Sequence, residues 1–290
     1  MTDVSIIANS ASSSAKQTGK GRTVPVLVSL AIAWLLLMVA IAILADLIRP
    51  YEITAYDLAN RLSLPGNLAH PLGTDELGRD VLSRLIESIR VSLLIAFGAT
   101  IISAVFGTFV GFLAANFRSV VEQIVLMLAD FQAALPFLIL SLAVLAFFGN
   151  SLWLLTCLMG FYGWERYARI ARGLAISASA QGYAAAVTQL GARPSWVYLR
   201  HILPNIASTL IVSMTLTFPE IILLESSLSF LGLGVQPPMT SLGNMVGYGR
   251  EYLTTAPWIM LTPAFVIMLT TLAISILGDW LRDRLDPTIR

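Results

Sequence analysis

Long stretches of the chain without any Asp, Glu, Lys or Arg alternate with shorter polar segments. These charge-free runs cover residues 24–45, 91–117, 131–164, 201–219 and 252–278. A helix of about 20 apolar residues crosses a bilayer core of roughly 30 Å. Each run is about that long or longer, so the pattern predicts an all-α, polytopic membrane protein.

The number of spans depends on how the longest run, 131–164, is divided. A Gly-Asn pair at 149–150 lies near its middle and is a turn signal. We expect the third span to reach back to about Val121 and the fourth to end near Tyr167, while the fifth continues to about Phe230. This division predicts six transmembrane helices.

The composition excludes an ordinary soluble domain. Of the 290 residues, 57% are hydrophobic and 12% are charged, whereas soluble domains carry about 25% charged residues. The net charge of +1 gives no indication of nucleic-acid binding, and the single cysteine, Cys157, excludes an internal disulfide.

The distribution of Lys and Arg predicts the orientation in the membrane. With the N-terminus inside, twelve of the 18 Lys and Arg residues lie in cytoplasmic segments and six in external ones, although the external segment 46–90 alone contains five. Both termini are then cytoplasmic, and residues 1–23 form a disordered cytoplasmic tail. A cleaved signal peptide is the alternative, but the apolar run at 24–45 exceeds the about 7–15 residues of a signal core.

The external segment 46–90 contains more order than a simple connection needs. Residues 70–75 predict a rigid turn, and apolar residues recur on one helical face after it. That face consists of Val81, Leu82, Leu85, Ile86 and Ile89. We expect this helix to lie along the outer membrane surface, and an ordinary interfacial helix is the alternative. A second external segment, 231–257, is rich in Gly and Pro and is expected to fold back on itself.

The internal segment 168–205 is also too long for a simple turn. It begins with a basic helical end and continues with small residues that allow close helix packing. Gly191 predicts a turn between two short helices, the second of which is amphipathic. Pro204 is expected to end that helix and to make Leu203 extended, with Asn205 as the N-cap of the fifth span. These features predict a rigid cytoplasmic projection that can transmit movement from a partner.

The sequence of this projection resembles the cytoplasmic signature of bacterial ABC importer permeases. The matching residues are Tyr183-Ala184-Ala185-Ala186, Leu190-Gly191-Ala192 and His201-Ile202-Leu203-Pro204-Asn205. Three further segments resemble the second, C-type permease subunit of dipeptide, oligopeptide and nickel importers. They are residues 72–84, 228–238 and 277–287. Together the resemblance covers roughly residues 25–290.

The resemblance implies a type I ABC importer permease fold in three parts. Residues 1–23 are the tail, 24–90 are the first transmembrane helix with the external segment, and 91–290 are a five-helix permease core containing the coupling loop 168–205. The coupling loop is expected to dock on an ATP-hydrolysing subunit through Tyr183, Ala185, Ala186, Gly191, His201, Pro204 and Asn205. The family usually has Glu where Ala185 stands, so docking through a carboxylate is not expected here.

The source of energy is expected to lie outside this chain. It has no G-x-x-x-x-G-K-[ST] sequence to cradle a nucleotide, so ATP would bind to partner subunits and the chain itself would hold no cofactor. The resemblance implies two cytoplasmic ATP-binding subunits, a second permease subunit that completes a heterodimer, and an extracytoplasmic solute-binding protein. Membrane lipid is a further expected partner.

The resemblance further implies an ATP-driven importer of di- and oligopeptides in the cell inner membrane, working by alternating access. Pro136, Pro219 and Pro263 would give three spans the kink or break that such a switch needs. A permease for nickel chelates or other small solutes is the alternative substrate class.

Three acidic residues within predicted spans are candidates for the translocation path: Asp130, Glu220 and Glu225. An ionised group near mid-membrane costs about 2.5–3.5 kcal/mol, so it usually faces protein or water. These residues either meet the charged amino terminus of a peptide or form structural hydrogen bonds between spans. Both interpretations stay open, and the structural one is the commoner case.

Catalysis is not expected. His201 could be a base, but no nucleophile lies at a useful spacing, and His70 is on the opposite side in the predicted topology. Two histidines and one cysteine far apart do not make a metal site. An ATP-independent transporter or channel would often show inverted repeats, and an intramembrane enzyme would need a polar catalytic pair. The sequence supports neither alternative.

Overall fold

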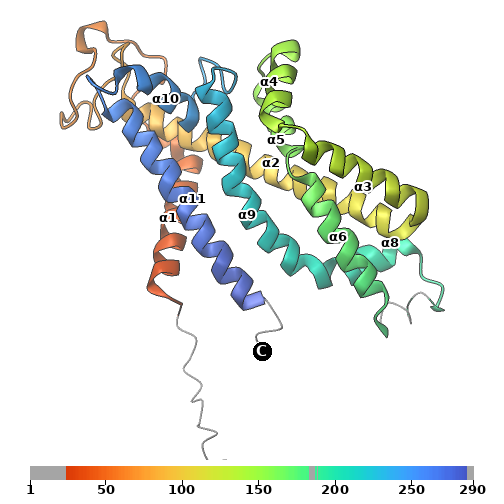
Figure 1. Cartoon of the computed structure of the whole chain (residues 1–290). Coiled ribbons are helices and arrows are strands. Elements are labelled where there is room, and N and C mark those ends of the chain that lie inside the picture. Colours follow the sequence, from red (N-terminus) through yellow and green to blue (C-terminus); the bar gives the residue numbers. More distant parts are fainter. Residues whose placement is uncertain (1–23, 183–186, 188, 286–290) are drawn as a thin grey trace, which may run out of the picture.

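The computed structural model describes residues 24–182, 187 and 189–285. In this part of the chain the elements are helices and turns, with one isolated bridge between Thr74 and Asp80. Four of the described helices are long and apolar enough to cross a membrane, the third of them together with the helical turns before it. They are α1 (Val26–Ile48), α2 (Val81–Phe117), α9 (Leu203–Phe230) and α11 (Trp258–Leu285). The predicted all-α membrane fold is confirmed (Figure 1).

The predicted third span is broken in its middle. It consists of α3 (Ser119–Ala134) and α4 (Phe137–Phe148), which are bent by 88° relative to each other. Pro136 causes the break, because it has no N–H for the helix and disfavours helical angles in the residue before it. Leu135 is accordingly extended, with φ −83° and ψ 133°. Counted as one span, this pair raises the number of candidate spans to five.

The predicted fourth span, 150–167, is two helices instead of one. Its first part is α5 (Leu152–Gly160), which at 1.5 Å per residue is about 14 Å long and too short to cross a bilayer core. Gly163 then adopts φ +79°, and a separate helix, α6 (Trp164–Ser179), begins after it. The predicted count of six spans is therefore only roughly supported.

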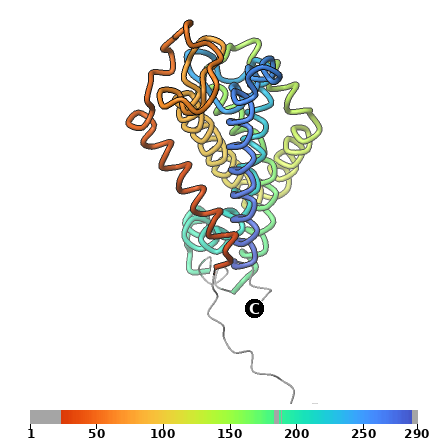
Figure 2. The backbone as a smooth tube through the Cα atoms, turned by 90° about the vertical axis from the view of Figure 1, so that its left-hand side faces the viewer, coloured from red at the N-terminus to blue at the C-terminus, as the bar shows by residue number. Residues whose placement is uncertain are grey.

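The two ends of the helix bundle are built from different segments (Figures 1 and 2). The external segment 49–80 and the short helix α10 (Leu242–Gly249) lie at one end. The beginning of α1, the end of α11 and the short helix α8 (Pro194–Val197) lie at the opposite end. The segments predicted to face the cytoplasm and the outside are thus at opposite ends of the molecule.

The second helix, α2, begins earlier than the predicted second span. Asp80 caps it by accepting a hydrogen bond from the backbone N–H of Ser83 at 2.7 Å. Four residues of the predicted apolar face are buried in protein: Val81, Leu85, Ile86 and Ile89. The predicted helix exists, but the expectation that it lies along the outer surface is wrong, because it forms the first turns of α2.

Helix α2 also forms the centre of the bundle. One core cluster joins it to α1, α5, α9, α10 and α11, and a second joins it to α6, α8 and α9. Gly107 allows α6 to approach closely, since a Cβ there would lie 2.4 Å from the backbone oxygen of Trp164. Pro219 and Pro263 lie inside α9 and α11, which continue through both prolines, so neither breaks its helix.

Candidate coupling segment, charged path and external network

The described part of the coupling loop 168–205, which consists of residues 168–182, 187 and 189–205, contains the predicted glycine turn. Gly191 has φ +82°, and no atom of the described residues lies within 4 Å of the position that a Cβ would take there. The backbone angle, rather than crowding, therefore requires a glycine. Tyr183, Ala185 and Ala186 lie outside the described residues, so their docking role stays a prediction.

The chain is helical from Pro194 to the end of α9, and the predicted break at Pro204 is wrong. Helix α8 passes into a π-helical turn, 198–202, and then directly into α9. Leu203 has φ −56° and ψ −47°, which are helical rather than extended angles. Pro204 is tolerated because it lies in the first turn of α9, after a wider turn that displaces the carbonyl its ring would meet. Asn205 accordingly lies inside the first turn of α9 and is not its N-cap.

Three large apolar side chains of this segment are exposed. Leu190, Trp196 and Leu199 are 87%, 49% and 63% exposed. The Trp196 ring lies edge-on to His201, with 4.7 Å between the ring centroids. Clustered apolar side chains on the surface are typical of a protein contact. We call Leu190, Trp196 and Leu199 the docking face.

The opposite face of the segment is packed into the bundle. Val197, Ile202 and Ile206 are buried in a cluster with small residues of α6, including Ala175 and Ala178. Small side chains allow two helices to approach closely. The segment is therefore packed directly on α6 and is continuous with α9.

Helix α6 carries three arginines at helical spacing, and each is paired with an acidic residue of another helix. The pairs are Arg166–Glu220 at 3.1 Å, Arg169–Asp130 at 3.0 Å and Arg172–Glu122 at 2.7 Å. The first two pairs contain predicted path residues, and their side chains are between 38% and 74% exposed. Charged groups usually face protein or water rather than lipid, which makes this face of α3, α6 and α9 a candidate for a surface that meets water or another subunit.

Glu225 differs from the other two path candidates because it is buried inside the chain. Its Oε1 atom accepts hydrogen bonds from the hydroxyl groups of Ser229 and Ser241, both at 2.7 Å. Ser241 in turn caps α10 by accepting a hydrogen bond from the backbone N–H of Asn244 at 3.2 Å. Glu225 therefore ties the outer part of α9 to the start of α10.

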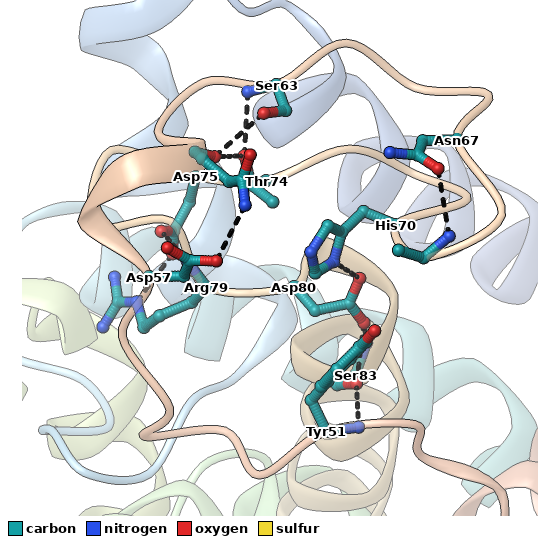
Figure 3. A network of polar contacts seen from close by, with 12 residues as sticks. Tyr51, Asp57, Ser63, Asn67, His70, Thr74, Asp75, Arg79, Asp80 and Ser83 are labelled. Carbon is teal, nitrogen blue, oxygen red and sulfur yellow. Dashed lines mark hydrogen bonds and ion pairs between the residues drawn. The ribbon is translucent and has the colours of Figure 1, made fainter.

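The external segment is held by a polar network around Asp75 (Figure 3). This buried carboxylate accepts a hydrogen bond from Nε of Arg79 at 2.7 Å and one from its backbone N–H at 2.9 Å, and it also contacts Arg84 of α2. Nearby, Nδ1 of His70 lies 3.0 Å from the Asp80 carboxylate. The sequence predicted the rigid turn but not the pairing of Asp75 with Arg84.

The sequence and the structure were compared with those of known proteins. Residues 103–290 match the family described as binding-protein-dependent transport system inner membrane component. The chain belongs to this family. It is therefore a multi-pass membrane permease rather than an enzyme, and it works with an ATPase and other transporter subunits.

Curated relatives match the permease over most of their length. It is 36% identical to the di/tripeptide transport system permease protein DppC of Pseudomonas aeruginosa, over 89% of this chain and 86% of that protein. It is 34% identical to the glutathione transport system permease protein GsiD of Pectobacterium atrosepticum, over 89% and 85%. It is also 34% identical to the oligopeptide transport system permease protein OppC of Bacillus subtilis, over 88% and 84%.

A solved structure shares the fold. The MetNI methionine ABC transporter in an inward-facing conformation matches with a TM-score of 0.55 and 18% identity, over 71% of this chain and 97% of that chain. The predicted ABC importer permease fold is thereby confirmed.

Proposed function

We propose that the permease imports di- and oligopeptides. The three relatives described above support this, since their names specify di- and tripeptides, oligopeptides and glutathione. A peptide with free ends carries an ammonium and a carboxylate group. A path for such a solute needs exposed groups of both charges, and the arginine–carboxylate pairs of α6 supply them.

The face formed by α3, α6 and α9 is the proposed lining of the path, opposite the second permease subunit. The exposure of Asp130 carries this proposal, because its side chain is 74% exposed within a predicted span. In this arrangement the ammonium group of a peptide competes with Arg169 for Asp130, and its carboxylate competes with Glu220 for Arg166. Exposed ion pairs contribute only about 0–1 kcal/mol, so the exchange costs little.

The docking face is the proposed contact with a cytoplasmic ATP-binding subunit. Closure of two such subunits on ATP displaces the docking face, and the continuous helix from α8 into α9 carries the movement to the path. The spans then alternate between inward-open and outward-open states. Gly191 and His201 serve this contact by shaping the turn and supporting Trp196.

The proposed assembly is a heterodimer of this chain and a second permease subunit, with two ATP-binding subunits and an extracytoplasmic solute-binding protein. ATP binds to the partners, and this chain holds no cofactor. The location is the cell inner membrane, with both termini in the cytoplasm. The beginning of α1 and the end of α11 support this, because they lie at the same end as α8 (Figure 1).

Peptide uptake into liposomes containing the complete transporter tests the proposal. We expect Asp130→Asn to lower ATP-dependent uptake of peptides with a free amino terminus by about two- to fivefold, which is the effect of one exposed ion pair worth about 0.5–1 kcal/mol. Uptake of N-acetylated peptides should change much less. Glu122→Gln is the matched control, since its pair with Arg172 is less exposed. Equal losses for both peptides would contradict the path assignment, and ATP-dependent uptake of other solutes without peptides would contradict peptide import.

A further inference from the structure

A long apolar groove of about 770 Å³ runs between α1, α2, α9 and α11. It includes the inner side of α1, the helix nearest the viewer at the left of Figure 2. Its lining includes Leu35, Val39, Ile43, Leu94, Phe97 and Phe218. Within the described part of the chain Ile43, Leu94 and Phe97 are 74%, 59% and 61% exposed. The groove is therefore an unfilled apolar surface in a membrane protein.

A group of four charged residues closes one end of the groove. Arg90 lines the groove, and its Nη1 atom lies 2.8 Å from Oδ2 of Asp46, which follows the apolar stripe of α1 by one turn. Arg49 lies 3.3 Å from Asp46 and 3.4 Å from Glu87. The group carries two positive and two negative charges. Asp46 and Arg90 remain accessible, with side chains 60% and 36% exposed.

The groove offers acyl chains an apolar path along α2. Along α2 the groove extends from Arg90 to Thr100, which is about 15 Å at 1.5 Å per residue. Acyl chains are much thinner than a helix and fit this space.

We propose that the groove binds one molecule of phosphatidylethanolamine. The acyl chains lie along the apolar walls, the phosphate pairs with Arg90, and the primary ammonium group donates hydrogen bonds to Asp46. Adjacent groups of opposite charge match a zwitterionic headgroup, whereas a group without net charge does not attract an anionic one. The trimethylammonium of phosphatidylcholine has no N–H and cannot donate to Asp46. The proposal does not depend on which solute the permease carries.

Lipid retention by the full-length permease, purified within its transporter, tests this proposal. The delipidated complex is given an equimolar mixture of dioleoyl phosphatidylethanolamine, phosphatidylcholine and phosphatidylglycerol, and retained lipid is identified by native mass spectrometry. We expect about tenfold preference for phosphatidylethanolamine, the effect of one charge-assisted hydrogen bond. Asp46→Asn should remove the preference, and Ala42→Trp, which fills the groove, should abolish retention of all three lipids.

The control is Arg61→Gln, because Arg61 lies in the external segment and donates to the backbone oxygen of Glu76. This variant should keep the preference. Equal retention of the three lipids would overturn the proposal, and so would a preference that persists in Asp46→Asn. Cross-linking of a photoreactive group at Ile43 to a partner helix instead of lipid would also overturn it. If Ala42→Trp fails to assemble, the isosteric Asp46→Asn variant still decides the outcome.

Discussion

Replacing Gly191 with valine tests the backbone angle of the coupling turn while leaving the other side chains of the docking segment unchanged. At φ +82° a residue with a Cβ pays about 1–2 kcal/mol, and a β-branched one lies at the upper end. No atom of the described residues lies within 4 Å of the Cβ position, so no clash with them adds to this cost. A cost of about 2 kcal/mol lowers the population of the turn roughly 30-fold. The spans keep their own hydrogen bonds, so membrane insertion should not change.

The assay is the number of peptides taken up per ATP hydrolysed by the complete transporter in liposomes. For Gly191→Val we expect this ratio to fall by up to roughly 30-fold while ATP hydrolysis continues. Asparagine tolerates the left-handed conformation, so Gly191→Asn should retain most of the coupling. These two variants place the same loss of flexibility at one position and differ in their tolerance of a positive φ.

Gly182 supplies the matched control for this experiment. Its Cβ position is also open, but its φ lies outside the left-handed region. Gly182→Val should therefore leave the ratio of uptake to hydrolysis close to that of the unmodified protein. An unchanged ratio in Gly191→Val would refute the coupling role of the turn. A similar loss in Gly182→Val would show that bulk, rather than backbone angle, is responsible.

Two further predictions concern the stability of the fold, measured as thermal unfolding of the purified transporter. Asp75→Asn leaves Arg84 buried without its carboxylate and should destabilise the permease by about 3–5 kcal/mol. The control Asp57→Asn, at an exposed site, should have little effect. Equal thermal unfolding midpoints for the two variants would contradict a stabilising role of the Asp75 network. Gly107→Leu should separate α2 from α6 and cost about 1–3 kcal/mol or more, since a Cβ there lies 2.4 Å from a backbone oxygen. Gly173→Ala in α6, with open space around it, should not destabilise, and a destabilised control would remove the packing explanation.

Hydropathy predicted the long helices because the bilayer demands apolar residues along a whole span. The first run, 24–45, corresponds closely to α1 at Val26–Ile48. Helix α2 begins ten residues before its charge-free run, because the arginines in its first turns have carboxylate partners. Arg84, for example, contacts Asp75. A count of charges along the sequence does not reveal such pairs, because the partners lie in other segments.

Helix breaks were predicted less well, since their effect depends on hydrogen bonding in three dimensions. Pro136 breaks a helix, whereas Pro204 lies in the first turn of one and does not. Gly163 separates α5 from α6 within a run that hydropathy treats as uniform. The glycine turn at Gly191 was predictable because it needs only a local backbone angle.

The charge pairs of α6 were also not predictable from the sequence. Arg166 and Arg169 were counted as cytoplasmic charges, and their partners are 54 and 39 residues away in the chain. Asp130 and Glu220 were recognised as unusual because charges are rare within spans. Their partners follow only from the way in which α3, α6 and α9 pack together.

Helix α6 connects the two parts of the proposed mechanism. Its small residues Ala175 and Ala178 support the docking segment, and its arginines hold the pairs that line the proposed path. The backbone contact at Gly107 packs α6 tightly against α2, and in the proposed mechanism a displaced docking face would move α6 relative to α3. Exposed ion pairs are weak enough to separate during such a movement. A switch driven by ATP therefore acts on the groups that would hold the ends of a peptide, without disrupting the buried core.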